Sequence, residues 1–178
     1  SATLVFNGEI YNFLELQRVL EEERFEFRSR SDTEVILHAY ARWGAECVRR
    51  LHGMFAFALW DGVRKELLLA RDRIGKKPLF YRFDGKTFLF GSEIKAILAG
   101  LDHTPGIDHN ALDDYLTYLC IPYPKTIFEG IRQMAPGTWM RVKVRAGGEL
   151  TTESETFWDP LEAPGSGRGS PGDLRGQL

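Results

Sequence analysis

Two residues near the start of the chain, Asn7 and Gly8, carry the groups that acyl-transfer chemistry needs. The side-chain amide of Asn7 is a hydrogen-bond donor, and Gly8, which has no Cβ, lets its backbone N–H approach a substrate closely. Two such donors aimed at one point can stabilise a developing negative oxygen, as in an oxyanion hole. An isolated Asn-Gly pair is more often an ordinary turn, so the neighbouring elements decide between the two interpretations.

The elements around this pair predict a strand, a sharp polar turn and a helix. The apolar run from Leu4 to Phe6 is typical of a buried strand, and Asn7 with Gly8 is expected to end it in a turn. Asn12 is a good N-cap residue, and apolar residues then recur at helical spacing from Phe13 to Leu20.

A second helix is predicted to begin at Ser31 and Asp32. Ser31 and Glu34 have the spacing of a capping box, and Gly44 is expected to end the helix. Taken alone, Asp32 is best explained as a helix cap whose charge suits the N-terminal dipole. The alternating stretch 25–29 before this helix predicts a strand.

From Met54 onward the pattern favours antiparallel strands joined by hairpins, with turns at Asp61-Gly62 and Asp84-Gly85. The strands are expected at 54–60, 66–71, 78–83 and 87–90, the helices at 92–98 and 109–118, and a closing hairpin at 139–144 and 150–156. Residues 1–160 are expected to form one domain. Residues 161–178, rich in Gly, Pro, Ser and Arg, predict a flexible linker or tail.

Composition excludes several classes of partner. A net charge of −2 gives no reason to expect a nucleic acid or an anionic membrane as a partner. No apolar run is long enough to span a bilayer, and no signal-peptide pattern opens the chain.

The two cysteines, Cys47 and Cys120, form no CxxC motif, which favours a reduced, cytoplasmic setting but leaves open whether they pair. The four histidines have no ligand-spaced neighbours, so no metal site is expected.

Several ordered motifs together resemble a known family. They are Phe-Asn-Gly-Glu-Ile-Tyr-Asn at 6–12, Ser-Asp-Thr-Glu at 31–34, Leu-His-Gly-Met-Phe-Ala-Phe at 51–57, Ala-Arg-Asp-Arg-Ile-Gly-Lys-Lys-Pro-Leu at 70–79, Gly-Ser-Glu-Ile-Lys-Ala at 91–96 and Ile-Pro-Tyr-Pro at 121–124. To about Trp158 the chain is similar to the glutaminase domain of class II glutamine amidotransferases. Within that class it most resembles glutamine-hydrolysing asparagine synthetases.

The resemblance implies an α+β fold of the N-terminal-nucleophile hydrolase type, a partial αββα sandwich of antiparallel sheets that is incomplete at its N-terminus. In that family the nucleophile is a cysteine at the first residue of the mature protein, well before the Asn-Gly pair. The family continues into a synthetase domain with a Ser-Gly-Gly-Leu-Asp-Ser phosphate loop. Neither feature occurs in these 178 residues, so the chain is expected to be an inactive fragment of the glutaminase portion.

The resemblance also assigns roles to site residues. Asn7 and Gly8 would form the oxyanion hole, Asp32 would bind the α-ammonium group of glutamine, and Glu9 would face the same group. Glutamine and the synthetase domain are the implied partners, and a homodimer is a further expectation. No cofactor is implied for this chain, whereas ATP and magnesium would belong to the synthetase domain.

Other residues invite chemical interpretations that we set aside. Ser1 is an N-terminal hydroxyl, but it lies on the Asn7 strand and not on the family's nucleophile strand. Cys47 and Cys120 are expected in helices, among core residues. The block 71–78 lacks the Ser/Thr and the earlier Gly of a phosphate loop, so we expect it to support the sheet. The alternatives for the whole chain are a non-catalytic binding or regulatory module of the same fold, or an amidotransferase with another acceptor.

Overall fold

The main element of the fold is a five-stranded antiparallel sheet. The computed structural model describes residues 1–161, so all but the first residue of the expected tail at 161–178 lies outside the described residues. The strand order is β1-β2-β3-β7-β8. The strands are β1 (Ala2–Ile10), β2 (Gly53–Asp61), β3 (Glu66–Arg71), β7 (Thr138–Val144) and β8 (Leu150–Thr156). β1 and β8 are therefore the two edges of this sheet.

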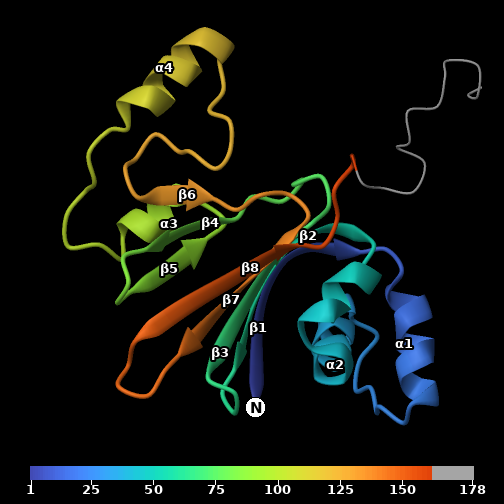
Figure 1. Cartoon of the computed structure of the whole chain (residues 1–178). Helices are drawn as coiled ribbons and strands as arrows, with labels where there is room; N and C mark the ends of the chain where they lie inside the picture. Colours follow the sequence, from blue (N-terminus) through green and yellow to red (C-terminus); the bar gives the residue numbers. More distant parts are fainter. Residues whose placement is uncertain (162–178) are drawn as a thin grey trace, which may run out of the picture.

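A smaller three-stranded antiparallel sheet lies against one face of the first. Its order is β5-β4-β6, from β4 (Phe80–Phe83), β5 (Phe88–Gly91) and β6 (Ile131–Gln133). The short helix α3 (Ile94–Leu98) packs on β4 and β5. Helix α4 (His109–Tyr118) stands farther out, away from both sheets (Figure 1).

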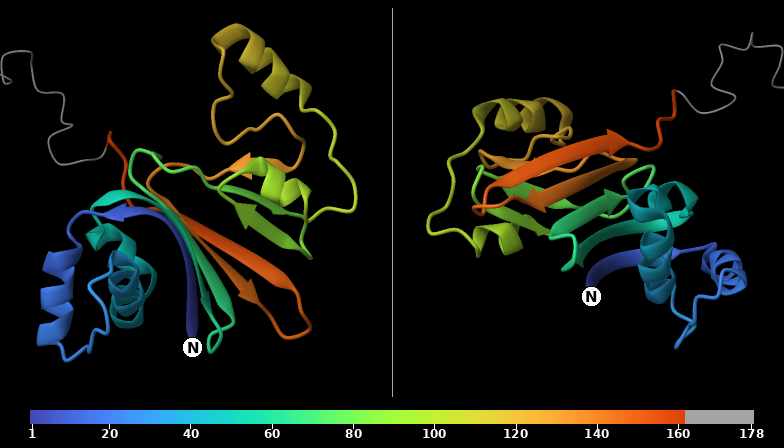
Figure 2. Two further views of the ribbon diagram at one scale, coloured as in Figure 1. Left: turned by 180° about the vertical axis from the view of Figure 1, so that it is seen from behind. Right: turned by 60° about the horizontal axis from the view of Figure 1, so that its bottom comes forward.

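The opposite face of the large sheet is covered by helices, as both views in Figure 2 show. They are α1 (Phe13–Glu22), α2 (Asp32–Trp43) and the 3₁₀ helix η1 (Gly44–Arg50). The layers thus run helix, sheet, sheet, helix. The expected α+β class with stacked antiparallel sheets is confirmed.

Alternation along β2 divides the core in two. Phe55, Phe57 and Leu59 point to the helices and join the larger buried cluster with Ile36 and Val48. The small residues Ala56 and Ala58 point the other way and join the cluster between the sheets. Successive strand residues face opposite sides, so one strand contributes to both cores.

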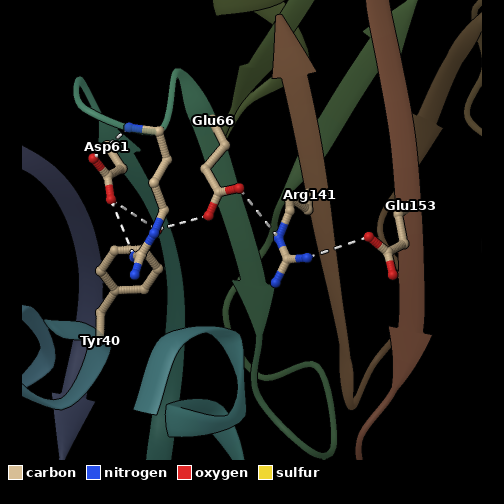
Figure 3. A network of polar contacts seen from close by, with 6 residues as sticks. Tyr40, Asp61, Glu66, Arg141 and Glu153 are labelled. Atoms are coloured by element: carbon tan, nitrogen blue, oxygen red, sulfur yellow. Dashed lines mark hydrogen bonds and ion pairs between the residues drawn. The ribbon is translucent and has the colours of Figure 1, made fainter. Parts of the chain in front are cut away.

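A polar network ties α2 to the large sheet (Figure 3). The hydroxyl of Tyr40 donates to Glu66 at 2.9 Å and lies 3.2 Å from Asp61. Arg141 lies between Glu66 and Glu153, at 3.7 Å and 3.3 Å respectively. Burial raises the pKa of Tyr40 further above neutral pH, where an ordinary tyrosine hydroxyl is already a donor.

Most predicted elements are confirmed. The structure has strands 66–71 and 150–156 and helix 109–118 at the expected bounds, and Gly44 follows the last residue of α2. β2 and β7 extend one residue beyond an expected end, β4 and α3 begin two residues later than expected, and β5 is shifted by one residue. β1 extends well beyond the expected run from Leu4 to Phe6, and β6 was not predicted. The strands from Met54 to Phe90 are shared between two sheets, since the chain crosses from one sheet to the other after Arg71.

The predicted strand at 25–29 is wrong. The backbone N–H groups of Arg28 and Ser29 donate to the carboxylate of Glu34, at 2.9 and 2.8 Å, and not to another strand. Phe25 and Phe27 instead pack their rings against His38, with centroids 5.4 and 4.5 Å apart. The alternation therefore reflects two aromatic anchors in a loop.

Candidate functional site

The strand β1 runs straight through Asn7 and Gly8, so the predicted turn at this pair is wrong. Asn7 pairs with Ala56 and Gly8 with Phe55, and the chain leaves the strand only after Ile10. Within the strand, Gly8 has a positive φ of +150°, a conformation that residues with a Cβ rarely adopt. A Cβ there would lie 2.1 Å from the carbonyl oxygen of Met54 and 2.7 Å from the Cα of Phe55. Only glycine allows this close approach of the two strands.

The side chain of Asn7 lies on the face of β1 that looks toward the smaller sheet. Its cross-strand partner Ala56 belongs to the core between the sheets, and paired residues share a face. Asn7 borders a cavity of about 70 Å³ there, together with Gly91 and Ser92. The exposed Asn7 amide therefore lies at the mouth of the space between the two sheets.

The backbone N–H of Gly8 belongs to the outer edge of β1. In an antiparallel pair, N–H groups alternate between the partner strand and the opposite side. The N–H of Tyr11 points toward the β2 side and donates to the carbonyl of His52, the residue before β2, at 2.7 Å. The N–H of Ile10 points to the opposite side and donates to Asp32. Gly8 is two residues before Ile10, so its N–H points to the same side of β1, away from β2.

Asp32 lies against that outer edge. One carboxylate oxygen, Oδ2, accepts the N–H of Ile10 at 3.1 Å, and the other lies 3.5 Å from the Thr33 hydroxyl. Asp32 is the first residue of α2, where the helix dipole favours negative charge. Within residues 1–161, no cationic side chain forms an ion pair with it. Asp32 and Gly8 are thus brought together on one edge, although they are 24 positions apart in the sequence.

The segment that leads into Asp32 is fixed by two caps. The Ser31 hydroxyl caps the helix by accepting the N–H of Thr33 at 3.2 Å. The predicted capping box is wrong, because the Ser31 hydroxyl does not accept the N–H of Glu34, and Glu34 reaches back beyond Ser31 to the N–H groups of Arg28 and Ser29 and to the Ser29 hydroxyl. The Arg28 N–H, followed by the Ser29 hydroxyl, lowers the pKa of Glu34 to about 2.

Glu9 is the least constrained of the expected site residues. Glu9 pairs with Met54, and its side chain is exposed. Because it is two residues from Asn7 in the strand, its side chain lies on the same face of the sheet as that of Asn7, and not on the side of Gly8. Among the described residues its carboxylate has no hydrogen-bond or ion-pair partner. The structure thus places Glu9 beside the site without fixing its direction.

The segment that begins at Arg71, the last residue of β3, makes structural contacts and holds β2, the strand opposite Gly8. The Arg71 guanidinium donates to the carbonyls of Lys77, Met134 and Gly75, at 2.6–2.8 Å. Burial lowers the pKa of Arg71. Asp72 is fully buried, and both of its carboxylate oxygens accept backbone N–H groups. Asp72 was not among the expected site residues. Its signal was an Asp directly after a strand and three residues before Gly75, a spacing typical of a closed turn.

Other chemically interesting residues lie away from this edge. Cys47 is buried, and that burial raises its pKa to about 12, so its thiol is a poor nucleophile. Cys120 is exposed and lies two residues after the end of α4, so the prediction that it lies in a helix among core residues is wrong. Both cysteines are free. Residues 1–161 contain no group of three or more His, Cys, Asp or Glu side chains arranged for a metal ion.

The larger cavities also avoid the site. One of about 520 Å³ is bordered by Arg73 and Trp158, and another of about 560 Å³ by Arg64 and Arg141. Neither includes Asn7, Gly8, Glu9 or Asp32. In the described part of the chain, no helix has the length and hydropathy of a membrane span.

Comparison with known proteins gives a consistent family. Residues 1–158 match the glutamine amidotransferase domain profile. Glutamine-hydrolyzing asparagine synthetase 3 of Bacillus subtilis is 46% identical over 135 residues, which is 75% of this chain and 22% of that protein. A putative glutamine-hydrolyzing asparagine synthetase of Mycobacterium tuberculosis is 43% identical over 146 residues, 79% of this chain and 22% of that protein. The chain therefore spans less than a quarter of the length of these relatives.

Solved structures share the fold. Glutamine phosphoribosylpyrophosphate amidotransferase from B. subtilis aligns with a TM-score of 0.55 at 21% identity, over 88% of this chain and 29% of that chain. A structure described as the allosteric regulatory enzyme of purine biosynthesis aligns with a TM-score of 0.59 at 22% identity, over 88% and 28%. With a profile match across nearly all of the described residues, the chain belongs to the glutamine amidotransferase domain family.

Proposed function

We propose that this domain forms the glutamine site of an amidotransferase and that glutamine binds along the outer edge of β1. The observation that carries the proposal is the hydrogen bond from Ile10 N–H to Asp32. Through this bond, a carboxylate that forms no ion pair within residues 1–161 lies two residues along the same edge from the Gly8 N–H. Two residues of strand span roughly 7 Å.

That spacing suits an amino acid with a side-chain amide. The Asp32 carboxylate would accept the α-ammonium group in a charge-assisted hydrogen bond. The carbonyl oxygen of the side-chain amide would then reach the Gly8 N–H at the other end. Asn7 would donate its side-chain N–H to the same oxygen from the mouth of the inter-sheet space, and Glu9 would supply a second carboxylate near the ammonium group.

The reaction assigned to this site is acyl transfer. A thiolate attacks the side-chain amide carbon, and the carbonyl oxygen becomes negatively charged in the tetrahedral intermediate. Asn7 and Gly8 would stabilise that charge while ammonia leaves, and water then releases glutamate. By the family resemblance the thiolate comes from an N-terminal cysteine, and neither Cys47 nor Cys120 takes that role here.

For the intact protein we propose an asparagine synthetase. Its synthetase portion would bind ATP and magnesium, activate aspartate and receive the ammonia released at this site. The two asparagine synthetases named above support this acceptor, since each is more than 40% identical to this chain where they align. An amidotransferase with another acceptor is the second candidate, and the protein outside this domain decides between them.

The experiment measures glutamate release from glutamine by the protein with all segments that its gene encodes. Replacing Asn7 by Ala removes one oxyanion donor and is expected to lower kcat by roughly 10²–10³-fold. Asp32→Asn keeps an oxygen for the Ile10 N–H but removes the charge. We expect KM for glutamine to rise by about 10–100-fold, the worth of a hydrogen bond to a charged group.

Two exposed residues of α4 provide matched controls, Asn110→Ala and Asp113→Asn. Both should leave kcat and KM unchanged. Wild-type protein that releases no glutamate, or an Asn7→Ala variant as active as Asn110→Ala, would contradict the proposal.

A further inference from the structure

The Asp72 carboxylate replaces a backbone carbonyl in the sheet. Phe55 and Asp72 are the next pair beyond Ala56 and Arg71 in the β2–β3 ladder. The N–H of Asp72 donates to the Phe55 carbonyl at 2.8 Å, as a normal antiparallel pair requires. The return bond does not go to the Asp72 carbonyl. The Phe55 N–H donates instead to Oδ2 of the Asp72 side chain, at 3.2 Å.

The Asp72 carbonyl is free for this exchange because it has turned away. It accepts the N–H groups of Gly75 at 3.1 Å and Gly137 at 2.9 Å. The carboxylate meanwhile accepts three further N–H groups, from Ile74 at 3.2 Å, Lys76 at 2.9 Å and Lys77 at 3.0 Å. Four donors fill the lone-pair positions that one carboxylate offers. Asp72 therefore ends β3 and at the same time extends the ladder by one pair.

The backbone of Phe55 is consequently held from both sides. On one side both of its polar groups bind Asp72. On the other side it faces Gly8, across a gap so small that a Cβ on Gly8 would lie 2.7 Å from the Phe55 Cα. A shift of Phe55 must therefore move Gly8, because close-packed backbone atoms leave no slack between them.

We propose that Asp72 is a positioning residue for the Gly8 N–H. It acts through Phe55 and sets the place of the oxyanion donor without touching the substrate. The inference rests on the proposed function, because it assumes that Gly8 stabilises the oxyanion. A displacement of about 1 Å at such a donor can cost roughly 10²-fold in rate.

A second buried carboxylate provides a matched control. Asp61 lies at the opposite end of β2 and also accepts two backbone N–H groups, those of Val63 and Arg64. A glycine whose amide resonance can be measured lies near each end of β2. Gly8 faces Phe55 at one end, and Gly62 follows Asp61 at the other and donates its N–H to the Ser1 carbonyl.

The first test records amide resonances of the 178-residue chain labelled with ¹⁵N-glycine. Asp72→Ala is expected to shift the Gly8 resonance and leave Gly62 in place, whereas Asp61→Ala should do the reverse. If Asp72→Ala does not fold, Asp72→Asn compared with Asp61→Asn gives the same comparison with smaller shifts. A Gly8 resonance that moves no more with a change at Asp72 than at Asp61 overturns the proposal.

The second test measures glutamate release by the protein with all its encoded segments. A displaced Gly8 N–H would stabilise the oxyanion of the transition state less well but would leave substrate binding unchanged. The Asp72 variant should therefore lower kcat by about 10–100-fold with KM for glutamine unchanged. The Asp61 variant should leave kcat unchanged. An inactive wild type refutes the proposed function, whereas an active wild type that depends on Asn7 but not on Asp72 refutes only this inference.

Discussion

At the scale of single residues, the site depends on where individual N–H groups of the backbone point. Ile10 donates outward to Asp32, while Phe55 donates to the side chain of Asp72. Each of these carboxylates joins segments that are distant in the sequence, and each does so with one or two bonds. A substitution of Asp32 should therefore alter the site more sharply than the stability of the fold, whereas a substitution of Asp72, which accepts four backbone N–H groups, should alter both.

Glu34 provides a residue-scale prediction about pH. Its pKa falls from 4.5 to about 2 in the folded state, chiefly through the Arg28 N–H and the Ser29 hydroxyl. A lowered carboxyl pKa adds stability that is complete above the unfolded value and is lost as pH falls toward the folded value. We expect Glu34→Gln to reduce the dependence of the urea midpoint on pH between about 4.5 and 2.

The neighbouring Glu26 is a suitable control, since its exposed carboxylate forms no hydrogen bond or ion pair within residues 1–161. Glu26→Gln should retain the wild-type slope. Equal slopes for the wild type and Glu34→Gln in that pH range would show that the folded state does not favour the ionised form of Glu34.

At the scale of elements, β1 and β2 approach each other through two glycines. Gly53 lies at φ +157°, and a Cβ there would come within 2.1 Å of the Glu9 carbonyl oxygen. Gly8 makes the equivalent approach to Met54 two positions away. The close pairing of these strands thus requires glycine on both of them.

Gly53→Ala should therefore destabilise the domain by overpacking and not only by backbone strain. Gly85→Ala is the matched control, because Gly85 also has a positive φ, +91°, but has open space around it. We expect the free energy of unfolding to fall by about 1–3 kcal/mol more for Gly53→Ala than for Gly85→Ala. Urea denaturation measures both, and equal losses would mean that the strands can separate without cost.

These elements also show what the sequence can and cannot predict. The helix 109–118 and the strands 66–71 and 150–156 follow from local periodicity, and the structure has them at those bounds. The conformation of Gly8 depends on Met54 and Phe55, and the loop at 25–29 depends on Glu34. Both are tertiary contacts, which local patterns do not contain. The site roles of Asn7, Gly8 and Asp32 therefore stay predictions of the motif, while the turn expected at Asn7 and Gly8 is wrong.

At the scale of the whole molecule, packing is uneven. The central strands β2 and β3 of the large sheet are buried on both faces, whereas α4 buries only Ala111. Leu116 and Leu119, at its C-terminal end, are 69% and 80% exposed. Figure 1 shows this helix apart from both sheets. Regions with so few buried contacts open at low free-energy cost.

Native-state hydrogen exchange should separate the two regions. We expect the amides of α4 to exchange through local opening, with protection at least about tenfold below that of β2 and β3. Leu116→Lys should leave the thermal midpoint unchanged, while Ile97→Ala, in the buried face of α3, should lower it. Protection in α4 equal to that in β2 would contradict this picture.

The bonds of Asp72 also set a rule for sequence length. One carboxylate reaches N–H groups at residues 74, 76 and 77, so their spacing from position 72 is fixed by the reach of a single short side chain. An insertion or deletion in this turn would leave buried donors unpaired. The hairpin at Gly147 has open space around that glycine, and no side-chain carboxylate accepts the N–H groups of residues 145–149 within the described part of the chain. In homologous chains, length variation should therefore occur in that hairpin and be absent from the turn.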